Sequence, residues 1–328
     1  MVETTRPPIE IGLTAAIVAV HECEPLILVV ASGDPSEPEG LPFGPFDPIH
    51  HRTLDMGLRA WVEEQAPLTL GYVEQLYTFG DRGRHARPGD VGPHLVSVGY
   101  LALTRVGAET SEALGRSGAG WRGWYDYFPW EDWRGGRPAL LDEVLLPALR
   151  RWAREGSGDG RPSRPLASRE RLRLAFGVGD TPWDEERVLD RYELLYSAGL
   201  IPEAAQDGRA PAAGLLPPGA AGRPMRFDHR RILATAISRL RAKLKYRPVV
   251  FELMPPEFSL TELQQTVEAI SGHHVHKQNF RRLVEAAALV EPTGAESRPR
   301  RGRPAALFRF RRDVLKERPA PGLRVGSR

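Results

Sequence analysis

The chain has a single cysteine and no long apolar run, and both absences exclude classes of protein. Cys23 has no partner for an internal disulfide and no neighbours for a zinc site, which favours a reducing compartment such as the cytoplasm. No stretch approaches the roughly 18 apolar residues that a membrane-spanning helix needs. The apolar segment 11–20 is too short, and it lacks the basic lead and cleavage site of a signal peptide. We therefore expect a cytoplasmic protein without a membrane partner.

A strong charge of one sign is also missing from the chain as a whole, since the net charge is +3 over 328 residues. The charges are unevenly placed, however. Segment 273–328 holds 14 Lys and Arg against 5 Asp and Glu, a balance of +9 that leaves −6 for the other 272 residues. This asymmetry predicts that the C-terminal end binds a polyanion; the alternative is a solvated basic tail. The length suits two domains better than one.

The first half of the chain is organised around a Pro- and Gly-rich loop and a short amphipathic helix, which we predict over Leu54–Gln65. Arg59, Glu63 and Glu64 are among its polar residues, and the strand-like GYVEQLYTFG follows. The pattern resembles the Nudix box, G-x5-E-x7-R-E-x-x-E-E-x-G, whose helix carboxylates hold Mg²⁺ against a nucleotide diphosphate while the metal activates water. An ordinary surface helix with two adjacent glutamates is the alternative.

This copy of the box has lost several of its characteristic residues. Ala60 stands where a glutamate should follow the arginine, His51 replaces the upstream glutamate, and the first glycine falls on Pro45. One metal-binding carboxylate is therefore missing, and Arg59 has lost its usual acidic partner. The resemblance implies a Nudix shape without efficient hydrolysis and without a requirement for Mg²⁺. An active pyrophosphatase that cleaves ADP-ribose or a related dinucleotide is the alternative function.

Strands and aromatic residues should build the core of this first domain. Four segments have the apolar runs or the alternation of strands: 11–20, 25–32, 73–80 and 94–104. The aromatic-rich segment 120–134 is either a platform on which an adenine or nicotinamide ring stacks or, as we favour, a strand and turn that fill the core. Its acids could also replace missing metal ligands: Asp126, Glu131 and Asp132.

A strongly amphipathic helix is predicted over 227–246, with Asp228 as its N-cap and Pro248 as its stop. Its apolar face consists of Ile232, Ala236, Ile237, Leu240 and Leu244. We interpret this helix as the hinge between two domains or as a dimer contact.

The pattern after Pro248 is typical of a winged helix-turn-helix. Ser259 and Glu262 form a capping box at the start of one helix, and Gly272 ends it. The following segment, HHVHKQNFRRLVEAAALV, is typical of a recognition helix whose N-terminal half reaches base edges and phosphates. Its outward-facing residues are Lys277, Gln278, Asn279, Arg281 and Arg282, although Asn279 could instead cap the helix.

A two-stranded wing is predicted from segments 290–293 and 306–310. The tip between them carries four arginines in six residues: Arg298, Arg300, Arg301 and Arg303. An arginine-rich tip of this kind fits the narrow, negative minor groove of DNA.

Taken together, YRPVVFELMPPEFSLTELQQ, HKQNFRR and GRPAALFRFR behind a Nudix-like domain resemble the Nudix-related transcriptional regulators of NAD metabolism, NrtR, and most closely their NadQ branch. The resemblance implies an α+β fold, with a Nudix-like α/β/α sandwich followed by a C-terminal winged helix-turn-helix domain. It also implies a cytoplasmic homodimeric repressor of NAD biosynthesis genes that binds a palindromic operator in double-stranded DNA. Its effector would be NAD, ADP-ribose or ATP, and no cofactor would be needed.

The resemblance also sets domain boundaries and ligand contacts. We expect a degenerate Nudix-like sensing domain at 1–226 with insertions over about 139–226, a linker or dimer helix at 227–247, a winged helix at 248–316 and a basic disordered tail at 317–328. The ligand contacts carried over from the family are Arg59, Glu63, Glu64, Phe79, Asp81, Arg82 and Arg84. A third function class, an RNA-binding adaptor, would show a preference for single-stranded RNA.

Overall fold

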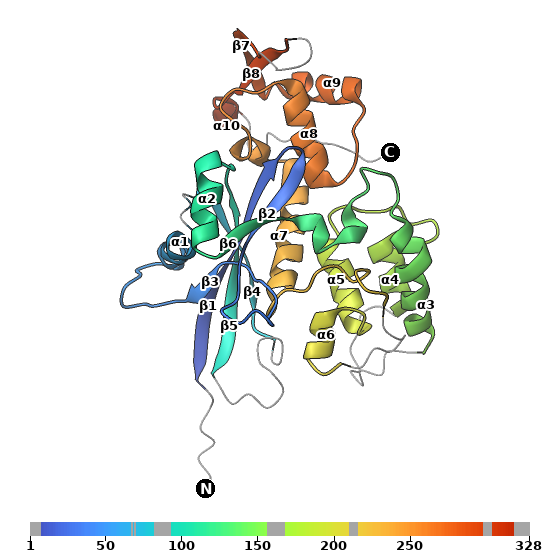
Figure 1. Ribbon diagram of the computed structural model, residues 1–328. Coiled ribbons are helices and arrows are strands. Elements are labelled where there is room, and N and C mark those ends of the chain that lie inside the picture. The colour runs from blue at the N-terminus through green and yellow to red at the C-terminus, as the bar shows by residue number, and fades with distance from the viewer. Residues whose placement is uncertain are drawn as a thin grey trace.

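The computed structural model describes residues 8–66, 68, 70–81, 93–155, 168–209, 216–297 and 304–317. Its centre is a mixed sheet with strand order β4-β5-β1-β2-β6, in which β3 also pairs with β1 (Figure 1). The strands are β1 (Ile9–His21), β2 (Glu24–Val30), β3 (Phe43–Pro45), β4 (Tyr72–Phe79), β5 (His94–Leu103) and β6 (Ala119–Gly123). β1 and β5 run parallel, whereas the other pairings in this sheet are antiparallel. The four strands that the sequence predicts are β1, β2, β4 and β5.

Helices cover both faces of the sheet, because side chains along each central strand point alternately to opposite sides. On one face α1 (Leu54–Gln65) and α2 (Ala108–Arg116) close a core that contains Leu13, Ala15 and Leu58. On the other face α7 (His229–Leu244) packs against the sheet, and Ala16 and Val18 belong to its core. The domain is therefore an α/β/α sandwich (Figure 1).

α7 is buried on two sides within the chain. All five residues of its predicted apolar face are buried, and Arg230 and Arg241 on other sides are buried too. It contacts the sheet on one side and α5 (Val188–Ser197) on the other. α7 therefore lies between the sheet and α5, and its role as a hinge or as a dimer contact stays a prediction.

The insertion between β6 and α7 is helical and packs beside α7 (Figure 1). Its elements are a π-helical turn (Leu141–Leu145), α3 (Leu146–Glu155), α4 (Ser168–Phe176), α5 and α6 (Pro202–Gln206). Leu149, Phe176 and Leu195 join the same apolar cluster as the α7 side of the sheet. The insertion is thus part of the first domain's core rather than a separate unit.

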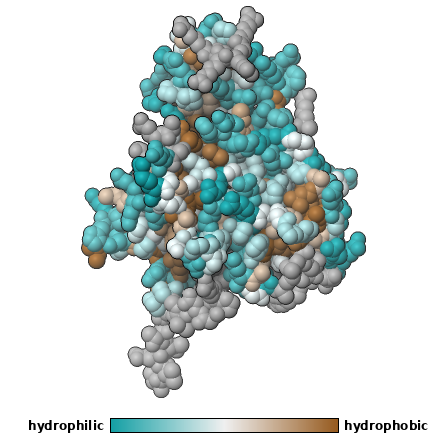
Figure 2. Space-filling view, viewed as in Figure 1, coloured by the Kyte–Doolittle hydropathy of each residue, from teal (hydrophilic) through white to brown (hydrophobic). Residues whose placement is uncertain are grey.

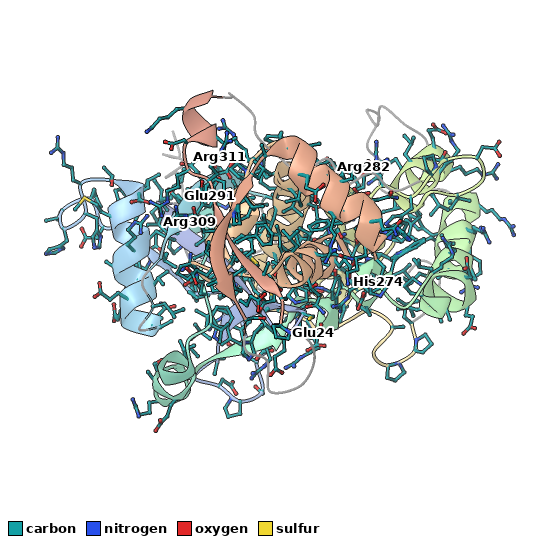
Figure 3. The ribbon with its side chains drawn as sticks, turned by 90° about the horizontal axis from the view of Figure 1, so that it is seen from above. Glu24, His274, Arg282, Glu291, Arg309 and Arg311 are labelled. Carbon is teal, nitrogen blue, oxygen red and sulfur yellow. The ribbon has the colours of Figure 1, made fainter. Side chains whose placement is uncertain are left out.

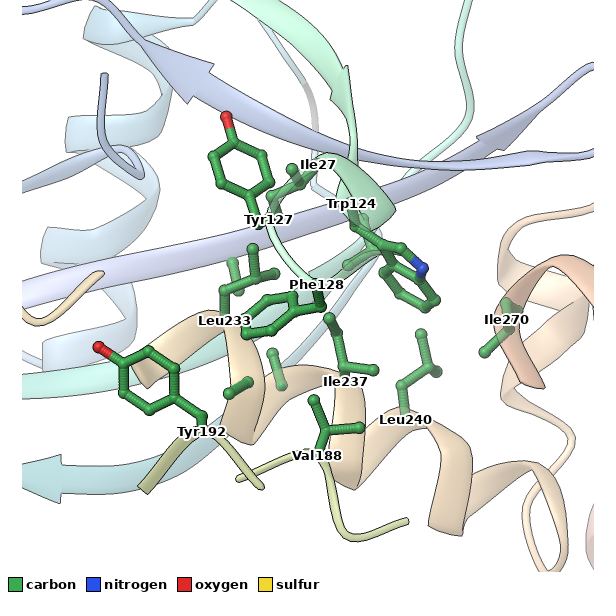
Figure 4. Close-up of a cluster of buried hydrophobic side chains, with 14 of the residues drawn as sticks. Ile27, Trp124, Tyr127, Phe128, Val188, Tyr192, Leu233, Ile237, Leu240 and Ile270 are labelled. Carbon is green, nitrogen blue, oxygen red and sulfur yellow. The ribbon is translucent and has the colours of Figure 1, made fainter. Parts of the chain in front are cut away.

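The aromatic segment after β6 fills the core, as we favoured from its sequence. It begins within β6 and continues as two 3₁₀ turns, Trp124–Asp126 and Pro129–Glu131. Four of its rings are fully buried: Trp124, Tyr127, Phe128 and Trp130. Figure 4 shows Trp124 and Phe128 against Ile237 and Leu240 of α7, so these rings are not a platform for a ligand.

The C-terminal part has the order of a winged helix. It consists of a 3₁₀ turn (Val249–Glu252), α8 (Leu260–Ser271), α9 (Lys277–Ala287), β7 (Val290–Glu296), β8 (Ala306–Phe310) and α10 (Val314–Glu317). The capping box of Ser259 and Glu262 is formed, and Gly272 ends α8 with φ 76°. Phe258 and Phe308 bridge the start of this domain to the wing. Among the described residues no helix has the length and apolar character to span a membrane.

Candidate functional site

α9 presents a polar row to solvent while its apolar residues anchor it. Phe280 and Val284 are 0% exposed, whereas the five predicted reading residues are all exposed: Lys277, Gln278, Asn279, Arg281 and Arg282. Asn279 is the third residue of the helix and not its cap, because the N-cap position belongs to His276. The outward orientation predicted from the sequence is confirmed.

The cations of α9 are not committed to acidic neighbours. Within the described part of the chain no ion pair involves Lys277, Arg281 or Arg282, although the structure pairs many other arginines. Figure 3 shows α9, with Arg282, and the wing, with Arg309 and Arg311, on the same upper side of the molecule. The surface over this domain is mostly hydrophilic on the face shown in Figure 2. A polyanion can therefore approach α9 without first breaking salt bridges there.

The turn between α8 and α9 is held by Glu268. Its carboxylate accepts hydrogen bonds from Gln264 Nε2 at 2.9 Å and Val275 N at 2.8 Å, and it pairs with His274 at 3.0 Å. Burial alone would raise the pKa of Glu268, but these hydrogen bonds lower it below its usual range. The carboxylate stays ionised and fixes the angle at which α9 leaves α8.

The wing carries its remaining cations at its base. Arg309 pairs with Glu291 across β8 and β7 at 2.6 Å, and the exposed Arg312 follows β8. The four arginines predicted at the tip lie outside the described residues: Arg298, Arg300, Arg301 and Arg303.

On the side of the predicted ligand, α1 is held by its N-cap and by Arg59. Thr53 caps the helix, and Arg59 Nε donates to Asp55 Oδ2 at 3.0 Å. Arg59 Nη1 also donates to Leu70 O at 3.0 Å. Asp55, one turn earlier, is thus the acidic partner of Arg59. Glu63 and Glu64 are exposed on the helix surface.

The structure does not bring all predicted ligand contacts together. Phe79 is 2% exposed and packs into the core on the α7 face of the sheet, opposite to α1. Asp81 follows β4 and pairs with Arg231 of α7. Arg82 and Arg84 lie outside the described residues. Motif matching along the chain could not show on which face of the sheet each residue would lie.

A cluster near the N-terminal end of α7 was missed by sequence reasoning. The rings of Phe43, Phe227 and His229 meet in T-shaped, edge-to-face contacts with centroids 5.1 to 5.6 Å apart, and Arg226 lies over Phe43 at 4.8 Å. Phe227 has φ 52°, an unfavourable value for a bulky residue, and is 38% exposed. Burial lowers the pKa of Arg226. No sequence signal joins these positions, because Phe43 is far from the others along the chain.

The acids of the aromatic segment do not form a metal site. Glu131 is 1% exposed and bound by Arg191 and Arg241, and Asp132 pairs with Arg134 at 2.8 Å. No group of three or more metal-ligating side chains occurs among the described residues. The idea that these acids replace the lost ligands of the box is wrong for Glu131, because two arginines already neutralise it.

Comparisons of the sequence with known proteins give two matches, one of them in the C-terminal part. Residues 250–310 match the family described as the NrtR DNA-binding winged helix domain. Over 84 residues, 26% of this chain, the sequence is 44% identical to the ADPR responsive transcriptional repressor NtrR of Acinetobacter baylyi. The match spans about a third (33%) of that relative's own length.

Comparison in three dimensions covers nearly the whole chain. The structure of Shewanella oneidensis NrtR complexed with a 27mer DNA is similar with a TM-score of 0.57 and 20% identity, over 97% of this chain and 99% of that one. A second structure of Shewanella oneidensis NrtR gives a TM-score of 0.54 at 20% identity, over 93% and 95%. At this identity the likeness establishes the fold, which is the expected Nudix-like α/β domain followed by a C-terminal winged helix domain.

Proposed function

We propose that the chain is a DNA-binding transcriptional repressor of the NrtR type whose operator affinity is set by an adenine nucleotide in its Nudix-like domain. The observation that carries the proposal is α9, a reading helix with five exposed polar residues in a segment that matches the NrtR winged helix domain. The regulated genes would be those of NAD biosynthesis, and the degenerate box favours the NadQ branch. A cytoplasmic location follows from DNA being the partner.

ADP-ribose is the first candidate for the effector, because the relative with 44% identity is named as responsive to ADPR. NAD and ATP share its adenosine and its linked phosphates and are the other candidates. We keep the seven predicted contacts for this site: Arg59, Glu63, Glu64, Phe79, Asp81, Arg82 and Arg84. Phe79 would support the site from within the core, since its side chain is buried.

Binding without hydrolysis is the activity that the box residues support. Ala60 has no carboxylate, and His51 cannot supply the hard oxygen ligand that Mg²⁺ prefers. Arg59 is held by Asp55, so the helix keeps its shape without the lost glutamate. We therefore propose a sensor that needs neither Mg²⁺ nor another cofactor.

The operator is expected to be palindromic, because a homodimer would place two copies of α9 about a two-fold axis. Half-sites would then be separated by about one or two helical turns of DNA. Ligand binding would lower operator affinity by as much as the ligand prefers the form that does not bind DNA.

The test is a fluorescence anisotropy titration of the full chain against duplex DNA from upstream of NAD biosynthesis genes, with and without ADP-ribose, NAD or ATP. We expect tight, salt-dependent binding that ADP-ribose weakens. Absence of duplex binding, or a preference for single-stranded RNA, would contradict the proposal that the chain binds operator DNA. If none of the three ligands at millimolar concentration changed the affinity, the proposal that an adenine nucleotide controls binding would be contradicted.

A pyrophosphatase is the second candidate, because Glu63 and Glu64 are kept and exposed. Mg²⁺-dependent release of AMP from ADP-ribose at ordinary enzyme turnover, abolished by Glu63→Gln, would favour it over the sensor.

A further inference from the structure

The C-terminal end of α8 is bonded to the Nudix-like domain rather than to solvent. A helix leaves its last carbonyl groups without partners inside the helix. Here Tyr125 Oη donates to Ala269 O at 2.7 Å, and Arg241 Nε donates to Ile270 O at 2.9 Å. The backbone N–H of Trp133 donates to Gly272 O at 2.8 Å. α8, the helix that precedes α9, is thus fixed at its C-terminal end by three hydrogen bonds from the first domain.

Arg241 is the centre of this contact, which we call the α8 junction (Tyr125, Glu131, Trp133, Arg241 and residues 269–272). Its guanidinium is 2% exposed. Nη1 donates to Glu131 Oε2 at 2.8 Å and to the carbonyl oxygen of Glu185 at 2.9 Å. One side chain on α7 therefore bonds the aromatic segment, the loop before α5 and α8 at once.

The junction contains more buried charge than a packing contact needs. Glu131 accepts hydrogen bonds from Arg191 at 2.5 and 2.8 Å in addition to that from Arg241. Two buried arginines share one carboxylate, and apolar residues of similar volume often give equal or better stability at such sites. What the charges do supply is a fixed geometry, because the Arg241 guanidinium satisfies all of its acceptors only in one position.

α7 connects the junction to the end of β4, near which the ligand contacts are proposed. At its N-terminal end Arg231 pairs with Asp81 and lies over the ring of Phe79, 5.3 Å from its centroid. Arg241 follows ten residues later, about 15 Å along the helix. A displacement of α7 by a ligand at the end of β4 would therefore move Arg241 together with Ile270.

We propose that Arg241 is the positioning residue through which the Nudix-like domain sets the placement of the reading helix. The proposal rests on the proposed function for the identity of ligand and operator. In this proposal α7 moves as a rigid helix. Asp81 and Phe79 contact its N-terminal end, and Arg241 near its other end bonds to α8. Glu268 fixes the position of α9 relative to α8. Arg241 touches neither DNA nor ligand.

Two variants test this in the full chain. Arg241→Met removes the charged contacts but leaves Glu131 paired with Arg191. Tyr125→Phe removes the bond to Ala269 O and the longer one, 3.4 Å, that Tyr125 Oη accepts from Arg241 Nη2. In both, backbone amides of residues 269–275 should exchange hydrogen at least about tenfold faster than in the wild type. The matched control is Tyr77→Phe, which alters an exposed tyrosine on β4 and should leave exchange at 269–275 unchanged.

The second measurement is the ratio of operator Kd with ADP-ribose to operator Kd without it. Both variants should bind ADP-ribose with the Kd of the wild type. Their ratio of operator Kd values should be closer to one and smaller than the wild-type ratio by about fivefold or more, since allosteric couplings typically span 5- to 150-fold. Unchanged exchange at 269–275 in a folded Tyr125→Phe protein would overturn the proposal, as would an unchanged ratio. A wild-type ratio of one would overturn the proposed function instead, and the exchange measurement would still decide the role of the junction.

Discussion

Gly272 shows most directly how one residue fixes the position of α8 and, with it, that of α9. It has φ 76°, and a Cβ there would lie 2.5 Å from the carbonyl oxygen of Glu131. The left-handed conformation alone costs a residue with a side chain roughly 1–2 kcal/mol. Gly272→Ala adds a clash with backbone that cannot move away, so we expect a larger loss in the free energy of unfolding, measured in urea.

Gly294 in the wing provides the matched control, because it also has positive φ, 80°, but has no atom within 4 Å of a built Cβ. Gly294→Ala should therefore show the conformational cost without the clash. Equal losses for the two variants would mean that the end of α8 is not tightly packed against Glu131.

His273 should make the junction sensitive to acid. Burial, followed by the charge of Arg241 and that of Arg191, lowers the pKa of its imidazole, and the charges of Glu185 and Glu131 oppose them only in part. Because this pKa lies below the unfolded value of about 6.5, the native protein binds fewer protons than the unfolded protein once pH falls below that value. Stability is therefore complete above about pH 6.5 and is lost as pH falls through the lowered pKa.

Unfolding free energy measured from pH 8 to pH 5 checks this prediction against His273→Gln, which cannot titrate. Below about pH 6.5 the unfolding free energy of the wild type should fall by up to about 1.4 kcal/mol per pH unit. The variant should not show this fall. Parallel curves would show that His273 keeps an ordinary pKa.

At the scale of elements, we predict that α9 determines DNA affinity. Arg281→Ala and Arg282→Ala should each weaken operator binding by about 1–3 kcal/mol if the side chain contacts a base edge. Arg116→Ala on α2 is the control, because that exposed arginine lies in the first domain, away from α9. Measured by anisotropy at one fixed salt concentration, equal affinities for all three variants would place the DNA surface elsewhere.

Elements with a strong local signal could be predicted from the sequence. The bounds of α1 are those of the predicted helix, and α8 begins and ends at its capping box and its glycine. β3 could not be predicted, because three residues show no periodicity. The aromatic segment was expected to be a strand and turn, but its two 3₁₀ turns had no signal of their own because they form through tertiary packing. The junction was missed for the same reason: Arg241 and Glu131 are 110 positions apart.

At the scale of the whole molecule, one apolar cluster runs from the sheet through α7 into the winged helix. It includes Val18 of β1, Leu240 of α7, and Val267 and Phe280 of the C-terminal domain. The two domains recognised in the sequence are therefore not joined by a loose linker. Packed side chains connect the two domains, and a ligand-controlled repressor requires such a connection.

The charge asymmetry of the chain gives the last prediction, which concerns the salt dependence of DNA binding. Each phosphate contact contributes about −0.9 to the slope of log K against log salt, because binding releases a condensed counterion. If Arg300, Arg301 and Arg303 each contact one phosphate, replacing all three with Ala should make the slope less steep by about 2.7.

A variant with Arg116, Arg154 and Arg169 replaced by Ala removes the same charge from exposed positions of the first domain. Anisotropy titrations over a range of KCl should leave the slope of this control close to that of the wild type. If the slope of log K against log salt became equally less steep in both triple variants, net charge would explain the salt dependence. Contact between the wing and the DNA groove would then not be needed to explain it.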